Sequence, residues 1–316
     1  MSPANLPSVK PFRFGVQLSG ALTRAGWRER AKQVEDLGYD VLTVADHVRD
    51  QFATTPAILA AADATSSIRV GSVVYANDFH HPVMLAKEAA SLDVLTEGRF
   101  EFGIGAGWQT SDYTTTGVPF DPPGQRIDRM AEALAIVRGL WADGPYSFSG
   151  NHYTITDLEG TPKPTQRFPP VFIGGGGKRM LTLAAREADI IGLNIKMWAG
   201  TIDEKSGPTA TAESTDVKLG WIREAAGDRF EQLTLQSRIH IAAVTDDPHG
   251  LAEVLGPVLG LSPAQALASP HALAGPVPAI VETLLERRER WGISYITISA
   301  DAFEAMAPVV AALHGS

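Results

Sequence analysis

The sequence predicts an α/β protein of the TIM barrel class, (β/α)8, with insertion segments, as a single domain over residues 1–316. Three observations predict it: eight short apolar stretches of strand character, helical stretches that alternate with them, and a length that suits one barrel with insertions. A doubly wound sheet is the alternative. That fold would more often show G-x-G-x-x-G directly after the first strand, and Gln17-Leu18-Ser19-Gly20 is different.

The strands are expected where short apolar and β-branched runs end at turn residues or polar residues. They are residues 12–19, 41–47, 68–75, 100–107, 171–173, 189–194, 234–244 and 295–299.

The helices are expected where apolar residues recur at helical spacing, with Pro at starts and Gly just past ends. They are residues 27–37, 56–64, 82–96, 125–141, 180–187 and 217–226, followed by pieces between 248 and 290. Residues 143–170 are rich in Pro, Gly, Ser and Thr, which predicts an insertion with at most a small hairpin at 146–155. The polar stretch 200–215 is long enough for a lid or a disordered loop.

The composition excludes several kinds of function. Acidic residues outnumber basic ones, 36 against 27, so the net charge of −9 and the scattered Lys and Arg argue against nucleic acid as a partner. The absence of cysteine excludes disulfides, thiolate metal sites and cysteine nucleophiles. No His, Asp and Glu set has convincing metal spacing, so no metal is expected. No run has the length of a signal peptide core or a membrane span, which predicts a cytoplasmic protein without membrane partners.

The pair Asp46-His47 ends the second predicted strand, where parallel barrels place their chemistry. An imidazole exchanges a proton readily near neutral pH, and the neighbouring carboxylate could orient it or contact a ligand. The alternative is that both side chains only cap the following loop by hydrogen bonds. Asp112 and Tyr113 are near enough in sequence to reach the loop that carries Trp108, or they lie on the surface.

Two glycine-rich segments also follow predicted strands. Glycines let the backbone approach a phosphate closely, and a helix N-terminus offers unpaired N–H groups. The segments are Gly105-Ala106-Gly107 and Gly174-Gly175-Gly176-Gly177, the second followed by Lys178 and Arg179. Four successive glycines are hard to explain as a plain turn, so we expect phosphate binding there first.

Taken together, these motifs resemble the luciferase-like flavin and deazaflavin oxidoreductase superfamily, in particular its actinobacterial branch that uses coenzyme F420. Each motif is weak alone, but their order and spacing cover nearly the whole chain. They are Phe14-Gly15-Val16-Gln17, Ala45-Asp46-His47, Gly71-Ser72-Val73-Val74, His81-Pro82, Gly98-Arg99-Phe100, Gly105-Ala106-Gly107-Trp108, the Arg126 helix and Ile173-Gly174-Gly175-Gly176-Gly177.

The resemblance implies an oxidoreductase that transfers a hydride between F420 and a small organic substrate, as a homodimer. His47 would exchange the proton and Asp46 would face the cofactor. A non-proline cis peptide is expected at the Ser72–Val73 bond, against the ring. The cofactor-binding set would be Asp46, Ser72, Val73, Gly105, Ala106, Gly107, Trp108, Gly174, Gly175, Gly176, Gly177, Lys178 and Arg179.

Trp108 is a departure from the family pattern. In similar sugar-phosphate dehydrogenases an acidic residue stands at this point and serves as catalytic acid. Tryptophan here argues against that substrate class and for a flatter, more apolar substrate face.

Two other functions stay open at this stage. A reduced-FMN-dependent monooxygenase of the same fold would use the same loops, because FMN and F420 both carry a ribityl phosphate and a tricyclic ring. A non-catalytic flavin- or deazaflavin-binding protein is the third, and the Asp46-His47 pair and the expected lid weigh against it.

Overall fold

The computed structural model describes residues 10–20, 23–197, 200 and 204–316. The chain forms two compact units. Unit 2 comprises residues 16–174 and 197–202, and unit 1 comprises residues 1–15, 175–196 and 203–316. The strands β1 and β8 contribute residues to both.

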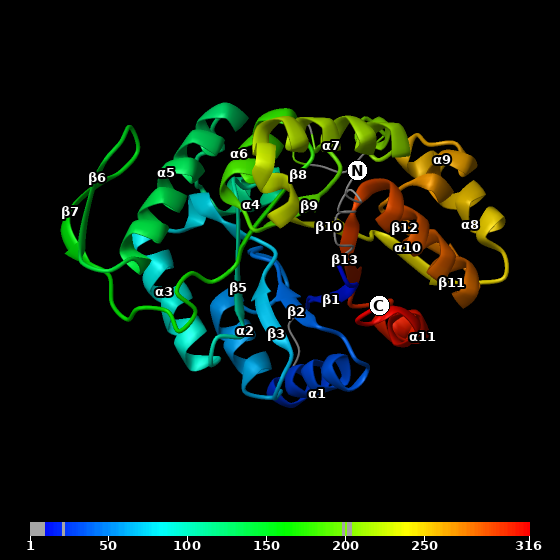
Figure 1. Ribbon diagram of the computed structural model, residues 1–316, viewed down its shortest axis with the longest axis horizontal. Helices are drawn as coiled ribbons and strands as arrows, with labels where there is room; N and C mark the ends of the chain where they lie inside the picture. Colours follow the sequence, from blue (N-terminus) through cyan, green and yellow to red (C-terminus); the bar gives the residue numbers. More distant parts are fainter. Residues whose placement is uncertain (1–9, 21–22, 198–199, 201–203) are drawn as a thin grey trace, which may run out of the picture. The chain divides into compact units, whose positions relative to one another are not determined.

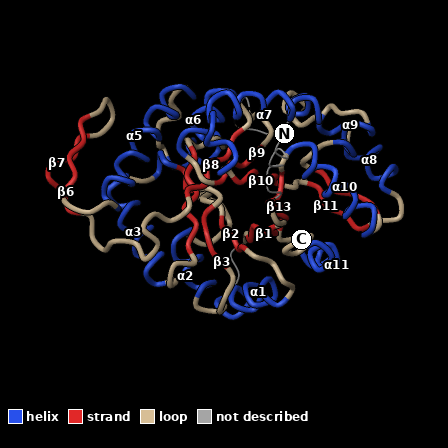
Figure 2. The backbone as a smooth tube through the Cα atoms, viewed as in Figure 1, coloured by secondary structure: helices blue, strands red, loops and turns tan. Residues whose placement is uncertain are grey.

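Unit 2 contains the first five predicted strands and their helices. The elements up to the end of α5 are β1 (Arg13–Leu18), α1 (Arg24–Asp36), β2 (Val41–Val44), α2 (Thr54–Ala62), β3 (Arg69–Ser72), β4 (Tyr75–Ala76), η1 (Asn77–Phe79), α3 (Pro82–Leu95), β5 (Phe100–Gly105), α4 (Thr110–Thr116) and α5 (Pro123–Trp141). After them come β6 (Pro145–Ser149), β7 (Thr154–Glu159) and β8 (Val171–Gly175). Figure 2 shows α1, α2 and α3 outside the strands β1–β3.

Unit 1 contains the remaining strands and helices. They are α6 (Lys178–Glu187), β9 (Ile190–Leu193), η2 (Gly207–Thr209), α7 (Ala212–Ala226), η3 (Gly227–Gln232), β10 (Thr234–Arg238), β11 (Ile241–Val244), α8 (Pro248–Leu255), η4 (Pro257–Leu259), α9 (Pro263–Ala268), β12 (Ala272–Gly275), α10 (Val277–Trp291), β13 (Ile293–Ser299) and α11 (Phe303–Leu313).

The main sheet confirms the predicted fold class. Its strand order is β3-β2-β1-β13-β10-β9-β8-β5-β4, and β3 also pairs with β5, so the order returns on itself as in a TIM barrel. The pairings β2–β3, β5–β8 and β9–β10 are parallel. Strands of such a sheet are covered on both faces, which explains why β2, β5 and β9 are buried at every position.

Local sequence explains several helix ends. The Thr23 side chain accepts a hydrogen bond from Gly26 N at the start of α1. Pro82 stands in the first turn of α3, after His81 as N-cap. Gly292, with φ of 74°, ends α10 in the left-handed conformation that glycine adopts without strain.

Two strand predictions are wrong in extent. The stretch 68–75 is interrupted after Ser72, so that β4 is a separate two-residue strand. The stretch 234–244 is two strands, of which β10 joins the main sheet and β11 pairs with β12 in a separate parallel sheet. Apolar residues are equally suitable for either sheet, so the run alone does not reveal the break.

The polar segments are more ordered than predicted. α4 lies in the stretch after the glycines of β5, where no helix was expected, and α11 follows the last strand. α7 begins at Ala212, five residues before the predicted start, with the Thr211 side chain accepting from Ser214 N. The lid prediction for 200–215 falls partly on residues 201–203, which lie outside the described residues.

The insertion forms the predicted hairpin. β6 and β7 pair antiparallel, and Figure 1 shows them extending away from α3 and α5. The Gly139 position of α5 packs against the Tyr146 ring, which leaves no room there for a Cβ.

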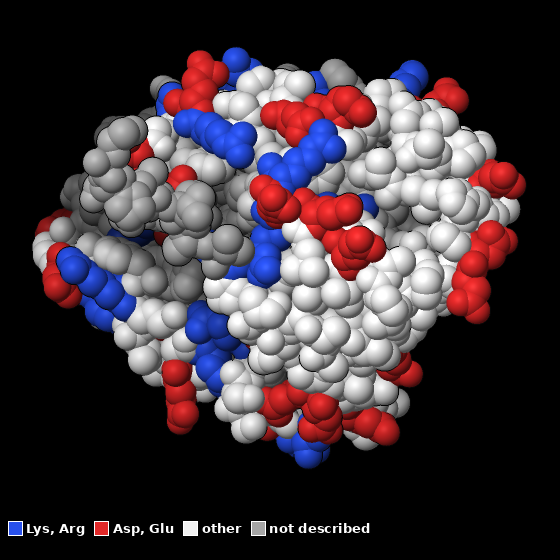
Figure 3. Space-filling model, turned by 45° about the vertical axis from the view of Figure 1, so that its right-hand side comes forward, with Lys and Arg blue, Asp and Glu red and all other residues white. Residues whose placement is uncertain are grey.

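Surface charges are mixed on the face drawn in Figure 3, where Lys and Arg lie near Asp and Glu. In the described part of the chain, no helix is long and apolar enough to cross a membrane.

Candidate functional site

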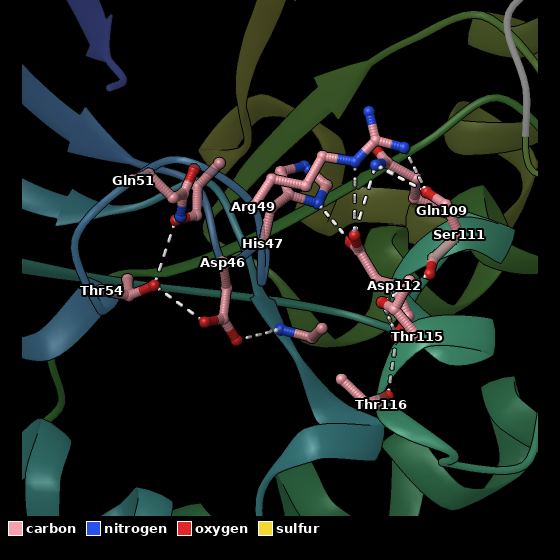
Figure 4. A network of polar contacts seen from close by, with 12 residues as sticks. Asp46, His47, Arg49, Gln51, Thr54, Gln109, Ser111, Asp112, Thr115 and Thr116 are labelled. Atoms are coloured by element: carbon pink, nitrogen blue, oxygen red, sulfur yellow. Dashed lines mark hydrogen bonds and ion pairs between the residues drawn. The ribbon is translucent and has the colours of Figure 1, made fainter. Parts of the chain in front are cut away.

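The loop after β2 presents Asp46 and His47 at the carboxyl end of the strand. Residues 41–45 are buried, whereas Asp46 and His47 are partly exposed. The Ala45 carbonyl accepts hydrogen bonds from Gln51 Nε2 at 2.7 Å and Thr54 Oγ1 at 3.0 Å, which hold the loop against the start of α2 (Figure 4). The two side chains therefore leave the strand in a defined conformation.

Asp46 is anchored on both carboxylate oxygens. Thr54 Oγ1 donates to Oδ1 at 2.8 Å, while Ala76 N and His80 Nε2 donate to Oδ2 at 3.0 and 2.7 Å. Burial raises the pKa of Asp46, but the hydrogen bond and charge of His80 and the other donors outweigh burial and hold that pKa below its usual value. Asp46 thus connects the end of β2 to the segment after β4. Among the hydrogen bonds of the described residues, none joins the Asp46 carboxylate to His47.

His47 pairs instead with Asp112 of α4. Its Nδ1 lies 2.6 Å from Asp112 Oδ2, and the Asp112 side chain is only 4% exposed (Figure 4). Because a carboxylate only accepts, Nδ1 carries the proton, and the neutral ring leaves Nε2 as an unprotonated acceptor. The His47 side chain is 25% exposed, so Nε2 can meet a ligand while Nδ1 is held.

Asp112 is itself oriented by its neighbours. Gln109 Nε2 donates to Oδ1 at 3.3 Å, and Arg49 Nε lies 4.0 Å from the same oxygen. Arg49 also donates to Ser111 Oγ (Figure 4). The sequence predicted that Asp112 lies either near the Trp108 loop or on the surface. It lies 65 positions from His47, and only the fold brings the two side chains together.

Trp108 lies beside the imidazole. The His47 and Trp108 ring centroids are 5.8 Å apart, and the rings are nearly perpendicular at 86°. This edge-to-face contact limits the orientations that His47 can adopt and gives the site an aromatic wall.

The segment Gly105-Ala106-Gly107 is held by hydrogen bonds from Arg126 of α5. Arg126 Nη1 donates to the Ala106 and Gly107 carbonyls. Gly107 has φ of 73°, and a Cβ there would overlap the Tyr113 hydroxyl. Packing against Tyr113 is therefore sufficient reason for glycine at 107, whether or not a phosphate binds nearby.

Ser72 lies within the sheet, and the cis peptide bond near it differs from the prediction. The Ser72 hydroxyl donates to Gly103 O at 2.7 Å and accepts from Gly103 N at 3.0 Å, so it joins β3 to β5 inside the sheet. The predicted cis peptide at Ser72–Val73 is wrong: the non-proline cis bond is Val73–Val74, one residue later. A strand pattern does not show which single peptide bond is cis, so the resemblance could not identify the exact bond.

The segment Gly174-Gly175-Gly176-Gly177 ends β8 and leads into α6. A Cβ at Gly175 would meet the Met180 side chain at 2.5 Å, and one at Gly176 would meet the Ile195 backbone at 2.5 Å. At Gly177 the nearest atom would be 3.8 Å away. Packing thus requires two of these glycines, and Gly177 lies open at the N-cap of α6 without a side-chain hydrogen bond.

Four other polar residues lie near the strand ends and the second glycine segment. Lys178 and Arg179 are exposed on the first turn of α6. His80 contacts Asp46, and His81 accepts from Val83 N at the start of α3. Among the described residues, no cluster of three or more His, Cys, Asp or Glu residues could hold a metal ion.

Comparison with known families bears on this arrangement. The family model for luciferase-like monooxygenases matches residues 8–208. This range includes the segments after β2 and β5 that carry His47 and Asp112, and the second glycine segment. The chain belongs to the luciferase-like monooxygenase family.

Relatives of this luciferase-like protein differ in cofactor. An F420-dependent glucose-6-phosphate dehydrogenase from Amycolatopsis mediterranei is 28% identical over 51% of the chain and 50% of its own length. An FMNH(2)-dependent dimethylsulfone monooxygenase from Pseudomonas putida is 27% identical over 56% of the chain and 47% of its own length. The chain therefore matches about half the length of these curated relatives.

Solved structures share the fold of this luciferase-like protein. A coenzyme F420-dependent tetrahydromethanopterin reductase from Methanopyrus kandleri superposes with a TM-score of 0.75 at 17% identity, covering 96% of this chain and 98% of that one. The monooxygenase RslO1 from Streptomyces bottropensis gives 0.70 at 18% identity, covering 95% and 96%. Identities this low bear on the fold alone.

Proposed function

We propose that the protein is an oxidoreductase that transfers a hydride between coenzyme F420 and a small organic substrate, with His47 as the proton partner. The hydrogen bond between His47 Nδ1 and Asp112 Oδ2 carries this proposal. A buried carboxylate that holds one ring nitrogen directs the other toward a reacting group, which is the arrangement general acid–base catalysis requires.

The bound deazaflavin would supply or accept the hydride at a ring carbon. In substrate oxidation, His47 Nε2 accepts the proton that leaves the substrate, and Asp112 stabilises the resulting imidazolium. In substrate reduction, the imidazolium donates that proton. Trp108 limits the motion of the ring during both exchanges. Asp46 holds the loop in place through its three hydrogen bonds rather than through contact with the imidazole.

The glycine segment before α6 fits the phosphate of such a cofactor. A Cβ at Gly177 would make only an ordinary contact with the Lys196 side chain, at 3.8 Å, and the first-turn N–H groups of α6 lack a side-chain cap. Lys178 and Arg179 add positive charge next to that end. We propose that these three residues would hold the phosphate, and that Gly175 and Gly176 keep the segment close to the adjacent backbone.

Gly177→Asp is expected to weaken deazaflavin binding by about tenfold or more, because the new carboxylate would repel the phosphate and occupy the N-cap. The measurement is a fluorescence titration of the purified variant. Gly220→Asp is the matched control, since Gly220 is an exposed position of α7 with open space around its Cβ. Equal affinities for the two variants, both folded, would remove Gly177 from the phosphate site.

A reduced-FMN-dependent monooxygenase is the second candidate, and the similarity to the dimethylsulfone monooxygenase favours it. Titration of the apoprotein with F420 and with FMN, followed by turnover with each reduced cofactor, separates the two. We expect F420 to bind at least tenfold more tightly. Micromolar FMN binding with substrate-dependent oxygen consumption, and no response to F420, would replace the first proposal by the second. The homodimer and the cytoplasmic location stay predictions.

A further inference from the structure

The carboxyl end of β10 in unit 1 carries a guanidinium with an unused donor. Arg238 is the last residue of β10, and its Nη2 donates to Ser299 Oγ, at the end of β13, at 3.1 Å. Arg238 Nη1 is buried and has no hydrogen-bond partner among the residues that the structure describes. The residue as a whole keeps part of its surface exposed.

The surroundings of Arg238 contain a buried lysine and two imidazoles. Because burial lowers the pKa of both imidazoles, only the lysine adds positive charge near neutral pH. Lys218 is 1% exposed, and its Nζ donates only to the carbonyls of Asn194 and Thr209 in the hydrogen bonds of the described residues. His240 Nε2 lies 3.1 Å from Asn194 Oδ1, and its ring centroid is 5.8 Å from that of His271. The nearby acid that acts on Arg238 is Asp301, which is exposed and makes no ion pair with it among the described residues.

An uncompensated buried charge of this kind destabilises the folded state. A buried donor without a partner costs about 1–3 kcal/mol, and more when the group is charged. Native proteins leave few such groups, and those that persist commonly serve a ligand or an ion. We infer that Arg238 and Ser299 form a binding site for an oxyanion, a carboxylate or a phosphate, that accepts hydrogen bonds from the guanidinium.

The position of the site indicates what the anion belongs to. Barrel enzymes bind substrates at the carboxyl ends of their strands, and Arg238 and Ser299 occupy the ends of two neighbouring strands. Under the proposed function, that anion would be a charged group of the substrate. This assignment to the substrate rests on the proposed function, whereas the anion site itself depends only on the contacts in unit 1.

Direct titration tests the site without any deazaflavin or turnover. We expect inorganic phosphate or acetate, each titrated calorimetrically at constant ionic strength, to bind saturably at millimolar concentration. Preference between the two probes distinguishes a phosphate from a carboxylate group. Arg238→Met should weaken that binding at least tenfold, Arg238→Lys should retain part of it, and Arg290→Met should leave it unchanged, since Arg290 pairs with Asp216 at the surface. Absence of saturable binding, or equal binding by Arg238→Met, overturns the site.

Thermal stability provides a second test, in which Arg238→Met should gain stability while it loses anion binding. Because the lost group is an unpaired charge, Arg238→Met should raise the unfolding midpoint in anion-free buffer by about 2–4 °C. The bound probe should stabilise the wild type and not this variant. A lower midpoint for Arg238→Met in anion-free buffer contradicts the inference. So does a variant that binds the probes normally but has lost F420 affinity, because Arg238 would then serve the cofactor.

Discussion

His47→Ala should lower turnover by about 10²–10⁴, the usual contribution of a positioned general acid or base, while the affinity for F420 should change by no more than a few fold. The reason is that Nε2 exchanges the substrate proton, whereas the ring makes a small part of any binding surface. Steady-state kinetics and a binding titration on the same preparation measure both quantities. His81→Asn is the matched control, because His81 is exposed and asparagine preserves its capping of α3.

The role of Asp112 can be separated from that of His47 by a double-mutant cycle. Asp112→Asn keeps the shape of the side chain but no longer compels Nδ1 to carry the proton, so kcat should fall by about 10² or more with little change in KM. If Asp112 acts through His47, adding Asp112→Asn to His47→Ala should cost little more. Additive losses would show that Asp112 acts independently, and loss of cofactor affinity in His47→Ala would make His47 a binding residue.

Acid should destabilise the protein through His240. Burial, aided by the charge of Arg238, lowers the pKa of His240 to about 4 from 6.5. Between these values the unfolded chain binds a proton that the folded chain does not, so stability decreases as the pH falls through that window. This residue alone should reduce the free energy of unfolding by about 2 kcal/mol between pH 7 and pH 5. The pKa of His271 is also lowered, first by burial, which adds in the same direction.

Denaturant unfolding at pH 7 and pH 5 measures the effect. His240→Gln should remove most of the His240 share, because glutamine can still donate to Asn194 Oδ1 and does not titrate. His249→Gln is the control, since His249 is exposed on α8. A wild-type protein equally stable at both pH values, or a His240→Gln variant with the full pH dependence, would rule out this mechanism.

The sequence by itself determined the class of the fold. Apolar β-branched runs such as 41–44 alternate with helical stretches, and eight such units in one chain are the pattern of a barrel. It also indicated where polar chemistry follows a strand, at Asp46 and His47, because a buried strand ends where solvent-facing side chains begin. The second glycine segment was recognisable for a different reason: four successive glycines are not explained by strand or helix propensity.

Only the tertiary structure decided which side chains act on one another. Nothing in the local sequence pairs His47 with Asp112 or Asp46 with His80, because each contact joins segments that follow different strands. The orphaned donor of Arg238 is equally invisible, since an arginine at the end of an apolar run predicts a surface charge. Long-range contacts depend on how the strand ends converge, and local periodicity does not record that convergence.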